Sequence, residues 1–146
     1  MKLLDANILL YAYNRDSPHH EPCRSWLERA FSAAETIALP WQTLLAFVRI
    51  VTNPRAVSKP LSGSQACAIV SEWLARPNVT IVGPGERFWA LFSRQVAEAQ
   101  VSGPLVTDAA LAALALEQGA ALCSTDRDFR RFRGLTLIDP LRQEDK

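Results

Sequence analysis

Two kinds of apolar pattern alternate along this 146-residue chain. Short apolar runs bounded by polar or turn-forming residues are typical of buried strands, whereas apolar residues at helical spacing indicate amphipathic helices. The pattern predicts strands at 2–4, 36–39, 79–82, 120–124 and 135–138, and helices at 8–13, 19–34, 41–52, 62–75, 85–100 and 107–118. Ser62 and Gly119 suit the start and the end of two of these helices, as an N-cap and a C′ residue.

The order of these elements predicts the fold class. Strands alternate with helices and no tight hairpin signal separates any two strands, so we expect an α/β protein with a mostly parallel sheet and helices on both faces. The length suits one domain with its own core. We therefore expect a single α/β/α domain over residues 1–141 and a polar tail over residues 142–146.

Composition narrows the class of partner and compartment. The net charge of +1 supplies no global field that would attract nucleic acid, so any such binding must use a local basic patch. Three cysteines without CxxC spacing favour neither a disulfide framework nor a zinc site. Because the chain shows neither a signal peptide nor an apolar run long enough to cross a membrane, we expect a cytoplasmic protein with no membrane partner.

The chemically informative residues are acids at element junctions. Asp5 and Asp126 each follow an apolar strand-like run, and Asp108 stands where a helix begins. Taken singly, each is an ordinary helix-cap or turn acid. In an open α/β sheet, however, such junctions gather at the carboxyl ends of the strands, where ligands bind. Carboxylates that meet there repel one another unless a cation lies between them.

A hard cation such as Mg²⁺, or Mn²⁺ in its place, fits this set of oxygen donors. We expect Asp5, Asp108 and Asp126 to be its ligands and the catalytic residues, with Asn7 and Thr125 adding neutral polar groups beside them. A metal ion so held lowers the pKa of a water molecule and neutralises charge on a scissile phosphate. Metal-assisted phosphodiester hydrolysis is therefore the leading interpretation.

Four stretches in order resemble the PIN-domain family, and within it the VapC-type toxins of bacterial toxin–antitoxin pairs. They are residues 4–9, 44–55, 107–115 and 124–129, and with the length they extend the resemblance over essentially the whole chain. The resemblance implies a doubly wound α/β/α sandwich, an Mg²⁺-dependent endoribonuclease, and a homodimer inhibited by a small cognate antitoxin. It also implies the same three metal-site acids, with Asp128 nearby and Asn7 and Thr125 as polar supports.

The chain departs from the family pattern in the third predicted helix. Many members carry a Glu just before the residue that matches Phe47, where this chain has Ala46. Helical spacing places Gln42, Ala46, Arg49 and Asn53 on one face, and none of them is a carboxylate. The missing carboxylate leaves the number of metal ions, one or two, open. The alternative function is a non-catalytic PIN domain that binds RNA or a protein partner.

Basic and aromatic residues supply candidate binding groups. Arg49, Arg127 and Arg130 are candidate RNA contacts, although Arg49 has an equally good interpretation as half of a partly buried ion pair. Most of the four tryptophans are expected in the core, while Trp41, beside a proline at a helix start, has a second interpretation as part of a groove for a partner peptide.

Two other enzyme classes on similar sheets fit less well. A phosphotransfer receiver needs a lysine on a late strand, and Lys2, Lys59 and Lys146 are not so placed. A haloacid-dehalogenase-like phosphatase needs Asp-x-Asp after its first strand, where this chain has Asp5-Ala6-Asn7.

Overall fold

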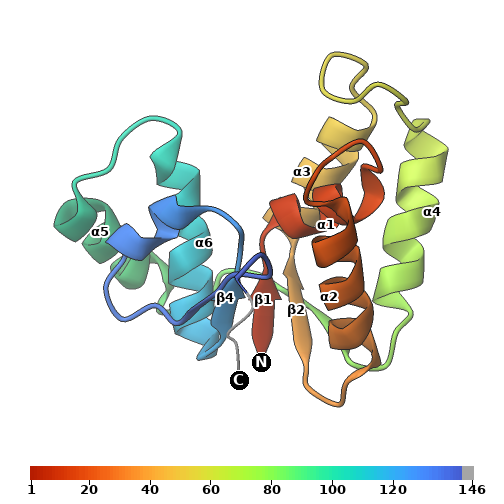
Figure 1. The fold of residues 1–146 in the computed structure, drawn as a ribbon. Helices are drawn as coiled ribbons and strands as arrows, with labels where there is room; N and C mark the ends of the chain where they lie inside the picture. Colours follow the sequence, from red (N-terminus) through yellow and green to blue (C-terminus); the bar gives the residue numbers. More distant parts are fainter. Residues whose placement is uncertain (143–146) are drawn as a thin grey trace.

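The computed structural model describes residues 1–142, so the tail predicted over 142–146 lies outside the described residues except for Arg142. The described residues form five strands and six α-helices, with two α-helices between successive strands as far as β4 (Figure 1). The strands are β1 (Lys2–Leu4), β2 (Ile37–Pro40), β3 (Val79–Val82), β4 (Ala121–Cys123) and β5 (Leu137–Ile138). The helices are α1 (Ala6–Tyr13), α2 (His20–Ser32), α3 (Trp41–Val51), α4 (Gly63–Leu74), α5 (Phe88–Ala99), α6 (Leu105–Gln118) and the 3-10 helix η1 (Arg127–Arg131).

The five strands form one sheet in the order β3-β2-β1-β4-β5. Every neighbouring pair is parallel, with Leu3 opposite Ala38 of β2 on one side and Leu122 of β4 on the other. The predicted α/β class with a mostly parallel sheet is confirmed, and the sheet is parallel throughout. Parallel sheets need helices on both faces, because each strand is buried on both sides.

Successive residues of β1 enter different cores, as the alternation of side chains along a strand requires. Leu4 packs with α1 to α4 on one face, whereas Leu3 packs with α5, α6 and η1 on the other. Figure 1 shows the same division, with α5 and α6 to the left of the sheet and α1 to α4 to its right. The α/β/α layering is therefore confirmed.

The strand order creates a switch point beside β1. The chain runs outward from β1 to β2 and β3, then returns to place β4 on the opposite side of β1. The loops after β1 and β4 consequently diverge toward opposite faces of the sheet, and the region between them at the carboxyl ends of the strands, called the crevice below, is where open α/β sheets bind ligands. Asp5 directly follows β1, and Ser124 directly follows β4.

Three predicted boundaries are wrong for identifiable reasons. The helix predicted at 85–100 begins at Phe88, because the amides of Gly85 and Arg87 donate to the Glu117 carboxylate and hold this stretch as a turn. The helix predicted from Thr107 begins earlier, since Pro104 already has helical backbone angles at its N-cap. The last strand shortens to Leu137–Ile138 after Gly134, whose φ is 79°.

The predictions that Ser62 caps the start of one helix and that Gly119 follows the end of another are both confirmed. Ser62 accepts a hydrogen bond from the Gln65 amide while the Gln65 side chain accepts one from the Ser62 amide, which is a capping box. Gly119 has φ 63° at the end of α6, the left-handed conformation that glycine adopts without steric cost.

The expectation that most tryptophans lie in the core is confirmed for Trp73 and in part for Trp26, which packs partly buried against the same core, and is wrong for Trp89; the exposure of Trp41 leaves its second interpretation open. Trp73 is buried among α1, α2 and α3, with its ring 4.7 Å from that of Phe47. Trp41 and Trp89 are 55% and 71% exposed, so helical spacing alone did not distinguish a core face from an exposed one. Cys123 is buried in β4, and burial raises the pKa of its thiol to about 12.

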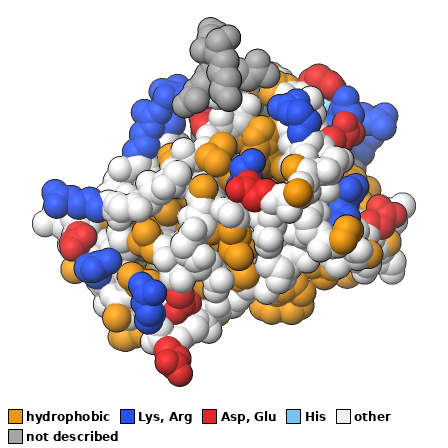
Figure 2. Space-filling view, turned by 90° about the horizontal axis from the view of Figure 1, so that it is seen from below, with side chains coloured by type: hydrophobic (Ala, Val, Ile, Leu, Met, Phe, Trp, Pro, Cys, Tyr) orange, Lys and Arg blue, Asp and Glu red, His pale blue; other side chains and the backbone are white. Residues whose placement is uncertain are grey.

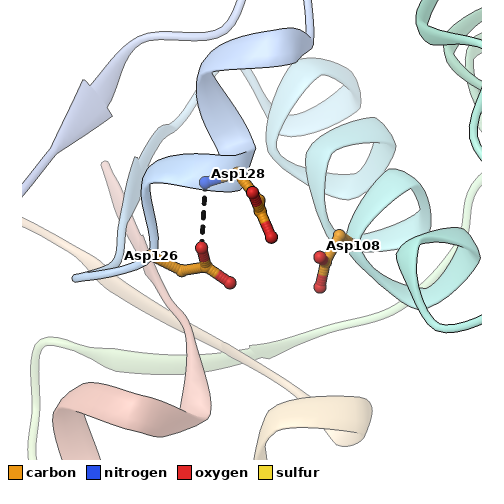
Figure 3. Close-up of side chains that lie close together, drawn as sticks. All are labelled: Asp108, Asp126 and Asp128. Carbon is orange, nitrogen blue, oxygen red and sulfur yellow. Dashed lines mark hydrogen bonds between the residues drawn. The ribbon is translucent and has the colours of Figure 1, made fainter.

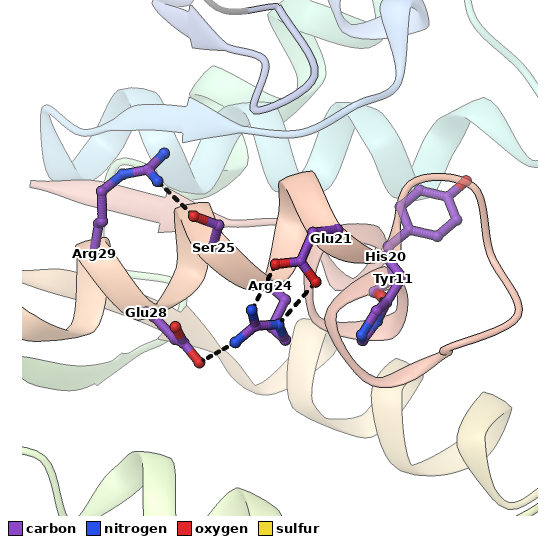
Figure 4. A network of polar contacts seen from close by, with 7 residues as sticks. All are labelled: Tyr11, His20, Glu21, Arg24, Ser25, Glu28 and Arg29. Atoms are coloured by element: carbon purple, nitrogen blue, oxygen red, sulfur yellow. Dashed lines mark hydrogen bonds and ion pairs between the residues drawn. The ribbon is translucent and has the colours of Figure 1, made fainter.

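Polar contacts run along α2, and one of them joins its first residue to α1. Arg24 forms ion pairs with Glu21 and Glu28 along the exposed face of α2, and the His20 ring lies 2.9 Å from the Tyr11 carbonyl (Figure 4). The exposed pairs contribute little to stability individually. Within residues 1–142, no helix is long and apolar enough to cross a membrane.

Candidate metal centre

Three carboxylates converge at the switch point. Asp108 lies in the first turn of α6, and Asp126 and Asp128 lie at the start of η1. One oxygen from each carboxylate lies within 4.8 Å of the others, and Figure 3 shows all three side chains pointing into one space between α6 and η1. The structure thus brings together two of the three predicted metal ligands with Asp128, which was predicted only as an accessory acid.

Asp5 lies beside this trio rather than within its closest set. It is the N-cap of α1, and its Oδ1 accepts a hydrogen bond of 2.7 Å from the Ala6 amide. Its Oδ2 accepts a hydrogen bond of 2.7 Å from the Ser124 hydroxyl. Each oxygen of a carboxylate has two lone pairs, so these bonds leave acceptor capacity for an ion or a water molecule.

Ser124 is the hydrogen-bond centre of the site, and the sequence analysis did not select it. Its hydroxyl donates to Asp5 and accepts from the Asn7 side chain and from the Asp126 amide, at 3.1 and 3.0 Å. The side chain is fully buried. A polar residue that ends a buried strand and precedes an acid by two positions is the signal that could have identified it, because buried hydroxyls need partners.

The predicted polar supports act in different ways. Asn7 donates from its amide nitrogen to Ser124, and its Oδ1 accepts from the Thr125 amide at 3.4 Å. Thr125 therefore contributes through its backbone amide. Together these bonds join the loops that follow β1 and β4, the two strands that flank the crevice.

Asp126 and Asp128 are held by the local structure of η1. Asp126 Oδ1 accepts from the Asp128 amide at 2.8 Å and so caps η1. Arg131 forms an ion pair with Asp128 at 3.4 Å, and its Nε also donates to the Asp128 carbonyl. One positive charge therefore compensates part of the negative charge of the trio.

The remaining negative charge changes the ionisation of the site. Burial raises the pKa of Asp108 to about 6, and repulsion from Asp126, Asp5 and Asp128 adds to the effect. Burial also raises the pKa of Asp5, although the hydrogen bonds from Ser124 and Ala6 oppose the rise. Acids with raised pKa values at a crevice are the arrangement that a bound cation would relieve.

This ionisation predicts a pH-dependent stability for the metal-free protein. The ordinary pKa of Asp108 is 3.8 and the folded value is about 6, so between these limits the folded state binds more protons than the unfolded state. Its contribution to the free energy of unfolding therefore falls as the pH rises from about 4 to about 6, and is constant above that range. Thermal melts in a chelator should show this decrease in the wild type and a smaller one in Asp108→Asn. Parallel curves for the two proteins would contradict the raised pKa.

The α3 side of the crevice carries no carboxylate. Gln42 donates from its side chain to the Thr107 carbonyl at 3.0 Å, so its face of α3 borders the start of α6. Ala46 follows one turn later and is partly exposed. Arg49 is exposed and forms no ion pair with any residue of 1–142, so the predicted partly buried ion pair is wrong and the phosphate contact stays a prediction.

Arg127 and Arg130 are exposed on η1, immediately beside the trio. Neither belongs to an ion pair within the described residues, so both are free to meet a phosphate. The face seen from below, where the N-terminus lies, carries Lys and Arg side chains scattered among acidic and hydrophobic ones (Figure 2). The side chains seen on that face form no continuous basic surface.

The donor set fits a hard divalent cation. Mg²⁺ prefers oxygen ligands and is commonly held by few carboxylates with several waters. Asp108, Asp126 and Asp128 supply three such oxygens at mutual distances that one ion can bridge, and Asp5 lies next to them. No histidine or cysteine belongs to this cluster within the described residues, which disfavours a softer metal.

The family model of the PIN domain matches residues 2–135 of the chain. This protein belongs to the PIN-domain family. Over 140 residues it is 41% identical to Ribonuclease VapC37 of Mycobacterium tuberculosis, a match that covers 96% of this chain and 97% of that protein. The resemblance described for the sequence is therefore confirmed.

Solved structures share the fold of this PIN domain. One is VapBC2 from Rickettsia felis bound to a promoter DNA fragment, with a TM-score of 0.71, 22% identity, and coverage of 94% of this chain and 97% of that one. Another is a toxin–antitoxin complex from Klebsiella pneumoniae, with a TM-score of 0.61, 16% identity, and coverage of 96% and 98%. At these identities the likeness concerns the fold alone.

The hydrogen bonds of Ser124 lead to a testable expectation for this PIN domain. Ser124→Ala removes the hydroxyl and leaves Asp5 Oδ2, the Asn7 amide and the Asp126 amide each without one partner. An unsatisfied buried polar group costs about 1–3 kcal/mol, so the free energy of unfolding should fall by at least that amount. Chemical denaturation measures the change. Ser124→Thr, which keeps the hydroxyl, should be less affected; an equal loss in both would point to packing instead.

Proposed function

We propose that this protein is the toxin component of a toxin–antitoxin pair and acts as a metal-dependent endoribonuclease. The observation that carries the proposal is the carboxylate trio at the switch point of a PIN domain, with Asp5 beside it. The name of its relative Ribonuclease VapC37, with which it is 41% identical over nearly the whole chain, supports the same activity.

The roles of the side chains follow from their contacts. Asp108, Asp126, Asp128 and Asp5 would hold Mg²⁺, with Mn²⁺ as a substitute. A divalent ion in such a site neutralises phosphate charge and lowers the pKa of a water molecule.

The other groups keep these acids in place. Ser124 fixes the Asp5 carboxylate, and Arg131 fixes that of Asp128. We assign Arg127, Arg130 and Arg49 to contacts with RNA phosphates, because all three are exposed and free of ion pairs within residues 1–142.

Two protein partners belong to the proposal. One is a small antitoxin, supported by the shared fold with a chain of a toxin–antitoxin complex. The other is a second copy of this chain. Trp41 and Leu45, one turn apart on α3, are 55% and 66% exposed, and exposed apolar pairs of this kind mark contact surfaces. Light scattering should give twice the chain mass of 16.2 kDa.

The activity is tested with purified protein and a defined single-stranded RNA. Fragments should accumulate with Mg²⁺ or Mn²⁺ and not with a chelator, while circular dichroism shows that the chelated protein is still folded. Binding of RNA without cleavage under every metal condition would favour the alternative, a non-catalytic PIN domain.

A further inference from the structure

Two consecutive residues at the start of α3 donate hydrogen bonds to the backbone carbonyls that directly precede Asp5 and Asp108. The Thr43 hydroxyl donates to the Leu4 carbonyl at 2.7 Å, and the side-chain Nε2 of Gln42 donates to the Thr107 carbonyl at 3.0 Å. Leu4 directly precedes Asp5, and Thr107 directly precedes Asp108. The first turn of α3 therefore holds the residue before each of two site acids.

These two acids belong to different layers of the fold. Asp5 opens α1, which packs with α2 and α3 on one face of the sheet, whereas Asp108 lies in α6 on the other face. Within residues 1–142, the Gln42 bond is the side-chain hydrogen bond that joins α6 to the layer of α1 to α4. The hydrogen bonds of Ser124 and Asn7 join the loops after β1 and β4, and the rest of the separation between the layers depends on packing against the sheet, which does not fix a direction as a hydrogen bond does.

The burial of Thr43 indicates that its bond is not incidental. Thr43 is 1% exposed although polar, and its one described side-chain partner is the Leu4 carbonyl. Leu4 itself is fully buried in β1. A buried hydroxyl that bonds to a strand end is a rigid contact, because breaking it would leave a polar group without a partner.

We propose that Gln42 and Thr43 are positioning residues that set the separation of Asp5 and Asp108 across the crevice. Helix α3 then serves the site through two hydrogen bonds to backbone, although it supplies no carboxylate at Ala46. The consequence for metal binding rests on the proposed function, whereas the consequence for the rigidity of the metal-free site does not.

The test uses near-isosteric variants with matched controls from the same chain. Gln42→Met and Thr43→Val remove the two donors, singly and together. Gln65→Met removes a helix-start glutamine bond in α4, and Thr52→Val removes a hydroxyl that donates to the Val48 carbonyl at the end of α3. Thr43→Ser keeps the hydroxyl and should restore wild-type behaviour.

Calorimetric titration with Mn²⁺ is the first measurement. The Gln42→Met/Thr43→Val double variant should bind Mn²⁺ about tenfold more weakly. The removal of groups that hold metal ligands in place typically lowers metal affinity by about this factor. The two control variants and Thr43→Ser should bind like the wild type. An equal loss of melting temperature in the double variant and the controls, with Mn²⁺ affinity unchanged in all, would overturn the proposal in favour of a merely structural role.

Hydrogen exchange of the metal-free protein separates this inference from the proposed function. Amides in the first turn of α6 and at the start of α1 should exchange about tenfold faster in the double variant than in the controls, since local opening becomes easier. Wild-type protein that binds no Mn²⁺ would refute the metal site, yet faster exchange would still support the positioning role. Exchange equal to that of the controls would refute that role, whatever the metal result.

Discussion

Replacing Asp108 by Asn is expected to reduce RNA cleavage by about a hundredfold or more. A metal ion contributes several kcal/mol to stabilising charge in the transition state, and each 1.36 kcal/mol corresponds to a factor of ten in rate. Asp108 is the one carboxylate of the trio that α6 supplies, so its loss removes the metal ligand on the α6 side of the site. Asp5→Asn should have a comparable effect. The amide carries no negative charge for the metal, and it has one acceptor oxygen where the carboxylate has two, which accept from Ala6 and Ser124.

The same variants should relieve growth arrest when the protein is expressed in a bacterial host. Asp139→Asn is the matched control, because Asp139 also follows a strand of this sheet but accepts from the Leu141 amide and pairs with Arg142. Cleavage rates, growth curves and protein levels should be measured together. If Asp108→Asn cleaves RNA as fast as Asp139→Asn at equal protein level, the trio is not the catalytic site.

Convergence of the acids was predictable from the sequence for a physical reason. Asp5 and Asp126 follow strand runs, and the carboxyl ends of parallel strands share one edge. Asp108 could be added because it opens the helix that precedes β4. Which acids would lie closest was not predictable, since the cap that Asp126 forms on η1 turns Asp128 inward beside Asp108.

Contacts between distant segments were beyond the reach of sequence patterns. In the sequence, Ser124 is one more small residue at the end of a buried strand. Only the folded structure shows that its hydroxyl lies between Asp5 and Asn7 and bonds to both. Gln42 reads as an exposed residue in the first turn of a helix, yet it bonds to Thr107, 65 positions away. Helical periodicity likewise does not show which face of α5 lacks a covering layer, and Trp89 is exposed there.

Position 46 offers the sharpest test of how α3 faces the metal centre. Ala46 lies one turn beyond Gln42, whose side chain reaches the backbone next to Asp108, and it is partly exposed. A carboxylate introduced there would face a group of acids in which the pKa of Asp108 is already raised to about 6 by burial and by its neighbours. Like charges repel in the metal-free protein, and a bound cation reverses the sign of that interaction.

Ala46→Glu should therefore lower the melting temperature of the metal-free protein by a few degrees, since 1 kcal/mol corresponds to about 2–4 °C for a chain of this size. Saturating Mg²⁺ should restore that loss, because a ligand that binds only the folded state stabilises it, and a further carboxylate beside the trio and Asp5 should tighten its binding. Ala46→Gln is the control, with nearly the same shape and no charge. Thermal melts of the three proteins with and without Mg²⁺ measure the effect. A metal-induced rise in Ala46→Glu no larger than in wild type would mean that position 46 does not face the metal, and Gln42 would then be the nearest residue of α3 to the crevice.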